Sequence, residues 1–143
     1  MRPTRPGGLG LCRGERGQAL LEFALVVPIL LLLLLGVVEF ARAWNVYEIL
    51  TDAAREGARQ AVVDNPAIGE GDVVNLIREA GGRAGIVIDP GNVQITGFHS
   101  GRGNTTTVRI EFDHELQWIG PLLGVFLDDT NVTMVTEFAM RNE

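Results

Sequence analysis

The chain has a single cysteine, two histidines and no lysine among its 143 residues. One cysteine, Cys12, excludes an intrachain disulfide and a zinc site made of several cysteines. All 12 basic residues are arginines, and 18 acidic residues outnumber them, which gives a net charge of −6. A nucleic-acid-binding protein needs a basic surface instead. The sequence also lacks a nucleophile motif, a phosphate-binding loop and a dinucleotide-binding motif, so we expect no catalytic site, cofactor or metal.

Charge is unevenly distributed along the chain. Residues 1–17 carry four arginines and one glutamate, whereas the remainder is strongly acidic. The same residues include two prolines and five glycines and show no hydrophobic period. This composition predicts a disordered basic leader. The length of the remainder leaves room for one modest folded domain.

A long apolar run follows the leader. No charged residue lies between Glu22 and Glu39, and the run contains six consecutive leucines. As a helix, residues 18–38 would span about 31 Å, close to the ~30 Å hydrocarbon core of a bilayer. Its large apolar side chains contribute about −6 kcal/mol to insertion, against a cost of about +3 kcal/mol for Glu22. We predict a transmembrane segment at 18–38 in contact with membrane lipid, with the arginine-rich N-terminus in the cytoplasm and the body outside.

The helical period continues beyond the apolar run. Through residues 39–63, apolar residues recur every three or four positions. The aromatic ones are Phe40, Trp44 and Tyr47. Asn65-Pro66 ends the pattern, because a proline disfavours helical conformation in the residue before it. We predict one amphipathic continuation of the same helix, kinked at Pro28 within the bilayer. Its outer apolar stripe must be covered either by the C-terminal domain or by other copies of the chain.

Residues 64–143 predict a small domain, which makes the fold class α+β with an antiparallel sheet. Residues 72–80 have a helical pattern, with Asp72 as a possible N-cap and Gly81-Gly82 as the stop. Short runs rich in β-branched residues follow at residues 86–88, 92–98, 105–112 and 131–140. The second and third of these runs alternate apolar and polar residues around a glycine-rich turn, which predicts an antiparallel hairpin. Residues 122–127 are apolar and fit either a helix or a strand.

The junction between the leader and the apolar run carries a motif. Gly17-Gln18 is followed by Glu22-Phe23 and then by an apolar helix with a proline. This arrangement resembles the processing site of type IV pilin-like proteins. Over the string GQALLEFALVVPILLLLLLGVVEFARAW and the later LTDAAREGARQAVV, the chain resembles the TadE-like pseudopilins of tight-adherence (Flp-type) pilus systems. The resemblance ends near Val63, and the C-terminal residues match no motif.

The resemblance implies a function and partners. A prepilin peptidase would cut between Gly17 and Gln18 at the bacterial cytoplasmic membrane. Glu22 would then be the fifth residue of the mature chain, where pilin-like proteins use a carboxylate for processing or assembly. Pairing with the amino terminus of a neighbouring subunit would lower the cost of both charges in hydrocarbon. From spacing alone, Glu22 could equally be an interfacial residue without a role.

The position in the pilus system and the other partners also follow from the resemblance. Phe23 stands where the small Flp pilins generally have tyrosine, and the chain has an additional C-terminal domain. Both features imply a minor or accessory subunit. Its partners would be the peptidase, other pilus or pseudopilin subunits and the membrane assembly platform.

The outer half of the helix contains further candidate residues. The segment at 53–59 matches the family, and its small residues permit close helix approach. Arg55 and Arg59 lie one turn apart, where they can pair with acids of a neighbouring subunit. A solvated face above small core contacts is the alternative for each residue. The candidate assembly residues are Phe40, Trp44, Tyr47, Arg55, Glu56, Gly57 and Arg59.

Two other signals compete with this interpretation. Ala41-Arg42-Ala43 fits a signal-peptidase site that would release a soluble domain, but Glu39 lies within the recognition region and the helical stripe continues through it. Asp113-His114-Glu115 suggests a metal or a general base, but neighbouring strand residues point to opposite faces, and we expect these side chains to be solvated.

The sequence therefore predicts a non-enzymatic, TadE-like minor pseudopilin for assembly or secretion of a pilus. The alternative is an unprocessed single-pass membrane protein with an extracytoplasmic binding domain.

Overall fold

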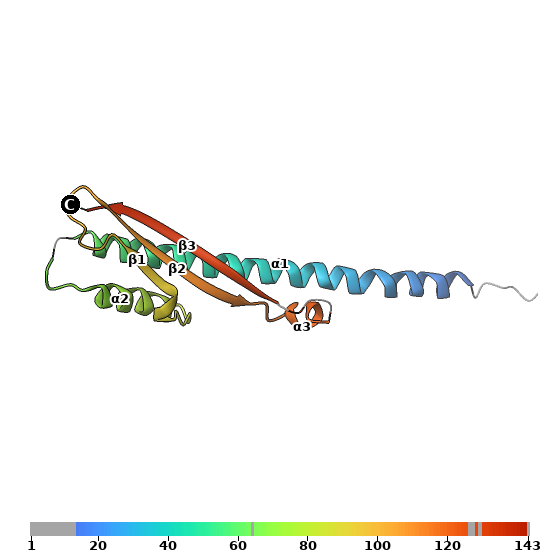
Figure 1. Cartoon of the computed structure of the whole chain (residues 1–143). Coiled ribbons are helices and arrows are strands. Elements are labelled where there is room, and N and C mark those ends of the chain that lie inside the picture. The colour runs from blue at the N-terminus through green and yellow to red at the C-terminus, as the bar shows by residue number, and fades with distance from the viewer. Residues whose placement is uncertain (1–13, 64, 126–127, 129, 143) are drawn as a thin grey trace, which may run out of the picture.

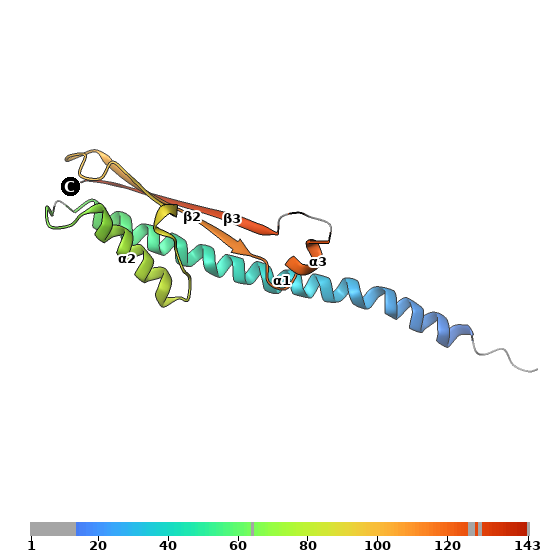
Figure 2. The same cartoon turned by 60° about the horizontal axis from the view of Figure 1, so that its bottom comes forward.

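A computed structural model of the chain describes residues 14–63, 65–125, 128 and 130–142. Its dominant element is α1, Gly14–Ala61, a helix of 48 residues with Pro28 inside it. Figures 1 and 2 show α1 as one long helix whose first half extends beyond the rest of the molecule. The predicted long helix is confirmed, with its ends at Gly14 and Ala61. The kink at Pro28 stays a prediction.

The start of α1 changes the expectation for the leader. Residues 14–17 were predicted to be disordered with the rest of the leader, but they form the first turn of α1. They continue the hydrogen-bonded turns of the apolar run, and helix extension costs far less than nucleation. The remaining leader residues, 1–13, lie outside the described residues.

The second helix, α2, covers Glu70–Arg83 and is longer than predicted at both ends. The prediction of Asp72 as the N-cap was wrong. The N-cap is Gly69, whose N–H donates to Asp72 Oδ2 at 2.9 Å. Gly81-Gly82 does not stop the helix either. Gly81 is needed for packing instead, because a Cβ atom there would lie 2.8 Å from Ile88 Cδ1. The chain reverses after the helix at Gly85, whose φ of 77° favours glycine.

Three antiparallel strands form a sheet in the order β1-β2-β3. They are β1 Val93–Thr96, β2 Thr105–Glu115 and β3 Asn131–Arg141. The predicted hairpin is confirmed, with Val93 paired to Ile110. The turn places Gly97 against the Thr105 carbonyl, where an added Cβ atom would clash with the oxygen.

Two shorter segments connect these elements. The β-branched residues at 86–88 suggested a strand, but this run is not one. Ile86 and Ile88 are buried in the core and are not paired in the sheet. The η1 turn, Pro90–Asn92, leads into β1. Between β2 and β3 lies the short helix α3, Gly120–Leu123, which resolves part of the ambiguous run at residues 122–127.

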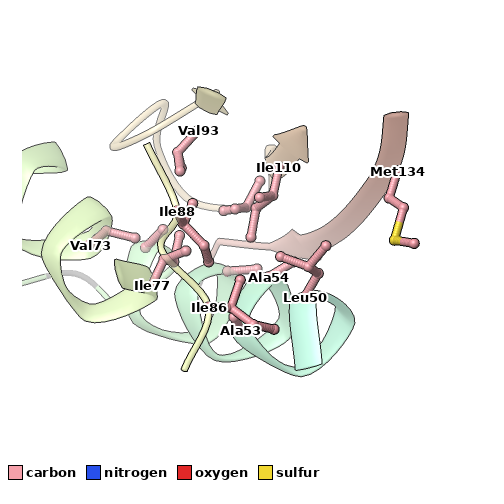
Figure 3. Packing of buried hydrophobic residues seen from close by; sticks show 13 residues of the cluster. Leu50, Ala53, Ala54, Val73, Ile77, Ile86, Ile88, Val93, Ile110 and Met134 are labelled. Atoms are coloured by element: carbon pink, nitrogen blue, oxygen red, sulfur yellow. The ribbon is translucent and has the colours of Figure 1, made fainter. Parts of the chain in front are cut away.

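The core lies between the outer half of α1, the helix α2 and one face of the sheet (Figure 3). From α1 it takes Leu50, Ala53, Ala54, Ala58 and Ala61. The other members are Val73, Ile77, Ile86, Ile88, Val93, Val108, Ile110 and Met134. The C-terminal part of the chain therefore covers one stripe of α1, fully from Leu50 onward and partly at Ala43, Val46 and Ile49. The molecule is α+β, as predicted, with a long apolar helix leading into a small antiparallel sheet.

Candidate functional site

The first half of α1 is bare. Nearly all large apolar side chains of residues 18–38 are exposed, Val27 and Leu35 being half-buried, and the most apolar stretch of the helix has no buried residue. By length and composition this helix can cross a membrane. A helix that is apolar on all sides and covered by no protein suits a lipid environment. The helix fits a membrane protein, while its orientation stays a prediction.

The predicted processing residues lie at the start of this bare half. Gly17, Gln18, Glu22 and Phe23 are all helical and exposed. A Cβ atom on Gly17 would meet nothing within 4 Å, so packing within the chain does not require glycine there. The described part of the chain thus leaves the junction open to another protein. Cleavage at Gly17 stays a prediction.

An aromatic stripe follows where the apolar run ends, formed by Phe40, Trp44 and Tyr47. The ring centroids of Phe40 and Trp44 are 6.2 Å apart, and those of Trp44 and Tyr47 are 6.3 Å apart. The three side chains are 41–67% exposed. The Trp44 indole donates a hydrogen bond to Glu48 Oε1 at 2.9 Å. Three large rings left outside the core indicate a surface suited to lipid headgroups or a partner protein.

Of the other predicted assembly residues, Gly57 packs inside the molecule, whereas Arg55, Glu56 and Arg59 lie at its surface. Gly57 is buried, and a Cβ atom there would lie 2.6 Å from Ile77 Cδ1, so its close helix contact is with α2 of the same chain. Arg55 lies beside Asp52, at 3.6 Å, and over the Phe138 ring.

Arg59 and Glu56 form an ion pair along the outer surface of α1. The hydrogen bond from Arg59 holds the pKa of the Glu56 carboxyl below its usual value. Both arginines of this segment thus have acidic neighbours on their own helix, one turn away in each case.

A buried polar cluster, which the sequence did not predict, joins the two halves of α1 to the sheet. Its centre is Glu39, only 1% exposed. Glu39 accepts hydrogen bonds from Arg42 Nη1 at 3.0 Å, from the Trp118 N–H at 2.9 Å and from the Gln117 N–H at 3.3 Å. His114 Nε2 lies 3.8 Å from Glu39 Oε1. A buried carboxylate is tolerated here because donors surround it.

His114 corrects a prediction. It was expected to be solvated, but it is 5% exposed, and among the described residues its Nε2 is a buried atom without a hydrogen bond. A signal was present in the sequence: His114 has the same strand parity as the buried Val108 and Ile110. Its neighbours Asp113 and Glu115 are exposed, as the alternation predicted. Proximity to Glu39 could not be found from spacing, because the two residues are 75 positions apart and meet only through the fold.

In the residues that the structure describes, no group of three or more His, Cys, Asp or Glu side chains is placed to hold a metal ion. The candidate site therefore comprises two surfaces of α1, the bare apolar half and the aromatic stripe, together with the buried Glu39 cluster between them.

Comparison with known proteins supports the resemblance. Residues 17–59 match the family model described as TadE-like protein, so the similarity predicted from the sequence is confirmed over the bare half and most of the outer half of α1. No curated protein and no solved structure matches the chain. The matched family and the bare helix together indicate a membrane protein related to the tight-adherence pilus. Such pilus-related proteins are generally not enzymes.

Proposed function

We propose that this chain, TadE-like over residues 17–59, is a minor pseudopilin that a prepilin peptidase cuts between Gly17 and Gln18. The mature helix anchors it in the bacterial cytoplasmic membrane, with the sheet outside. The observation that carries the proposal is where the match begins: its first residue is the glycine before the proposed cut, at the start of the exposed helix. A peptidase can therefore reach the cut site without unfolding the body, by which we mean the outer half of α1 together with α2 and the sheet.

The residues around the cut support a role in assembly. Removal of the basic leader leaves a new amino group at Gln18 and a carboxylate one helical turn later at Glu22. In hydrocarbon each charge is costly alone, and pairing between neighbouring subunits reduces that cost. Glu22 is exposed and remains available for such a contact. The exposed aromatic stripe is the proposed protein contact outside the membrane.

The Glu39 cluster argues against release of a soluble domain. Cleavage at Ala41-Arg42-Ala43 would remove Glu39 from the folded body. The Gln117 and Trp118 N–H groups would then lose their acceptor, and His114 its acidic neighbour. Loss of a buried hydrogen-bonded charge costs about 2 kcal/mol or more.

The mature N-terminus is the first test. Full-length protein would be expressed in cells with an active or an inactivated prepilin peptidase, isolated from membranes and measured by intact-mass spectrometry. We expect a chain beginning at Gln18 only with the active enzyme, and an uncut chain for Gly17→Leu. Gly36→Leu is the matched control and should be cut normally, because Gly36 also has nothing within 4 Å of its Cβ position. A chain beginning at Met1 in both strains would favour the unprocessed binding protein.

Glu22 is tested separately. Glu22→Ala should insert in the membrane at least as well as the unaltered chain, because a charge is removed from the apolar run. It should impair processing or pilus assembly, whereas Glu79→Ala, which removes an exposed acid of α2 outside the run and away from the aromatic stripe, should not. Normal pilus output from Glu22→Ala cells would refute the role of this carboxylate.

A further inference from the structure

The loop that contains α3 is unusually apolar for an exposed segment. Residues 116–125 include no charged side chain. Trp118, Leu122 and Val125 are 57%, 50% and 76% exposed. We call residues 116–125 the α3 loop. Neighbouring large apolar side chains without charge at a surface indicate an interaction site rather than isolated exposure.

The Glu39 cluster places this loop next to the membrane segment. Glu39 is the first charged residue after the apolar run, and its carboxylate accepts the N–H groups of Gln117 and Trp118 at the start of the loop. Figures 1 and 2 show α3 beside α1, beyond the ends of β2 and β3 and toward the bare half of the helix. At this end of the run Leu35 and Gly36 are half-buried, whereas Leu34 and Val37 are exposed. The α3 loop therefore lies level with the last turn of the apolar run.

The backbone of the loop is also suited to an apolar surrounding. Backbone N–H groups that approach the hydrocarbon core lose contact with water and then need acceptors within the protein. Gly120 N–H donates to the Leu116 carbonyl, and Gly124 N–H donates to the Gly120 carbonyl. Leu122 and Leu123 N–H both donate to the Ile119 carbonyl. Pro121 has no N–H, and Glu39 accepts those of Gln117 and Trp118.

From these observations we infer that the α3 loop is a second membrane contact. It rests in the outer interface of the same bilayer that α1 crosses, with Trp118, Leu122 and Val125 turned to lipid and Glu39 holding the loop at this depth. The inference rests on the membrane placement given under the proposed function. Lipid is the occupant because the loop is joined to the spanning helix at the level where that helix leaves the bilayer. Tryptophan favours this interfacial zone.

The two tryptophans of the chain allow a direct test. Trp44→Phe leaves Trp118 as the only indole, and Trp118→Phe leaves Trp44. Each full-length variant would be reconstituted in vesicles of phosphatidylethanolamine and phosphatidylglycerol, with or without lipids brominated near the headgroup. We expect brominated lipid to remove most of the Trp118 emission. Acrylamide in the water should quench Trp118 several-fold less than free tryptophan.

The outcomes separate this inference from the proposed function. Flotation of the vesicles and resistance to carbonate extraction report whether α1 is inserted. If the protein floats but Trp118 is quenched by acrylamide and not by brominated lipid, the second contact is wrong and the anchor stands. If Trp118 is shielded from both quenchers, protein covers the loop and the inference is also overturned. If the protein does not float, the membrane placement itself fails.

Glu39 is tested as a positioning residue in the chain that retains Trp118 alone. Glu39→Ala should lower the quenching of Trp118 by brominated lipid and raise its quenching by acrylamide. Glu39→Gln keeps an oxygen acceptor and should partly restore both values. Glu48→Ala, which removes the partner of Trp44 and not of Trp118, is the matched control. Circular dichroism confirms folding, and unaltered Trp118 quenching in folded Glu39→Ala would refute the role of Glu39.

Discussion

The two halves of α1 have the same secondary structure and opposite surroundings. Residues 18–38 expose large apolar side chains and contribute nothing to the core among the described residues. From Leu50 to Ala61, small and apolar residues of the same helix are fully buried by α2 and the sheet. The side chains of the first half are large and apolar on every side of the helix. Those of the second half are apolar along one stripe only and are small where another helix approaches.

This difference shows how one helix serves two solvents. In the first half, length and hydropathy are the features that suit a membrane, because lipid adapts to side chains of any shape. In the second half shape decides, because Gly57 leaves just the space that Ile77 occupies. Mutations of one kind should therefore have unequal effects in the two halves.

The largest difference is expected for truncation of leucine. Leu50→Ala removes a fully buried side chain and should destabilise the body by about 2–5 kcal/mol. Leu32→Ala, in the bare half, should change the stability of the body by less than about 0.5 kcal/mol. Thermal unfolding in detergent, followed by near-ultraviolet circular dichroism, would compare the two. Equal losses would mean that the bare half also packs on the body.

A smaller difference is expected when bulk is added. Gly57→Val places atoms where Ile77 already lies and should cost about 1–3 kcal/mol of folding free energy. Gly36→Val, with nothing within 4 Å of its Cβ position, is the matched variant and should leave the body unaffected. Limited proteolysis in detergent reports the result as a rate of cleavage within α2. Unchanged protection in Gly57→Val would show that α2 can move away from α1 at no cost.

The smallest effect concerns the surface of the outer half. Arg59 holds the pKa of Glu56 below the ordinary value of 4.5, so this pair stabilises the folded chain above that pH. The contribution is lost as the pH falls through the lowered pKa. Glu56→Gln should therefore reduce the unfolding temperature slightly at neutral pH and not at all at pH values where Glu56 is protonated. A difference that persists in acid would point to packing instead of charge. Because both side chains are solvated, salt should also diminish the effect.

Periodicity was sufficient for the elements whose pattern is local. The apolar run and the three-to-four spacing beyond it predicted α1 as one helix, and alternation around a glycine-rich turn predicted the β1-β2 hairpin. The predicted ends of α2 were wrong. Gly81-Gly82 resembles a helix-terminating signal, but the helix continues through it, and Gly81 is needed for the contact with Ile88. The division into a leader, a membrane segment, an amphipathic segment and a domain at 64–143 stays a prediction. The core nevertheless crosses its last boundary, since α1 supplies part of it.

The sequence by itself determined the long helix, its apolar half, the α+β class and the resemblance over residues 17–59, because each depends on residues near one another in the chain. Only the tertiary structure decided which parts of the outer stripe are covered: it buries Gly57 and leaves Phe40, Trp44 and Tyr47 exposed. It also brought Glu39, His114 and the α3 loop together. Such contacts depend on how helix and sheet pack in space, and no local period contains that information.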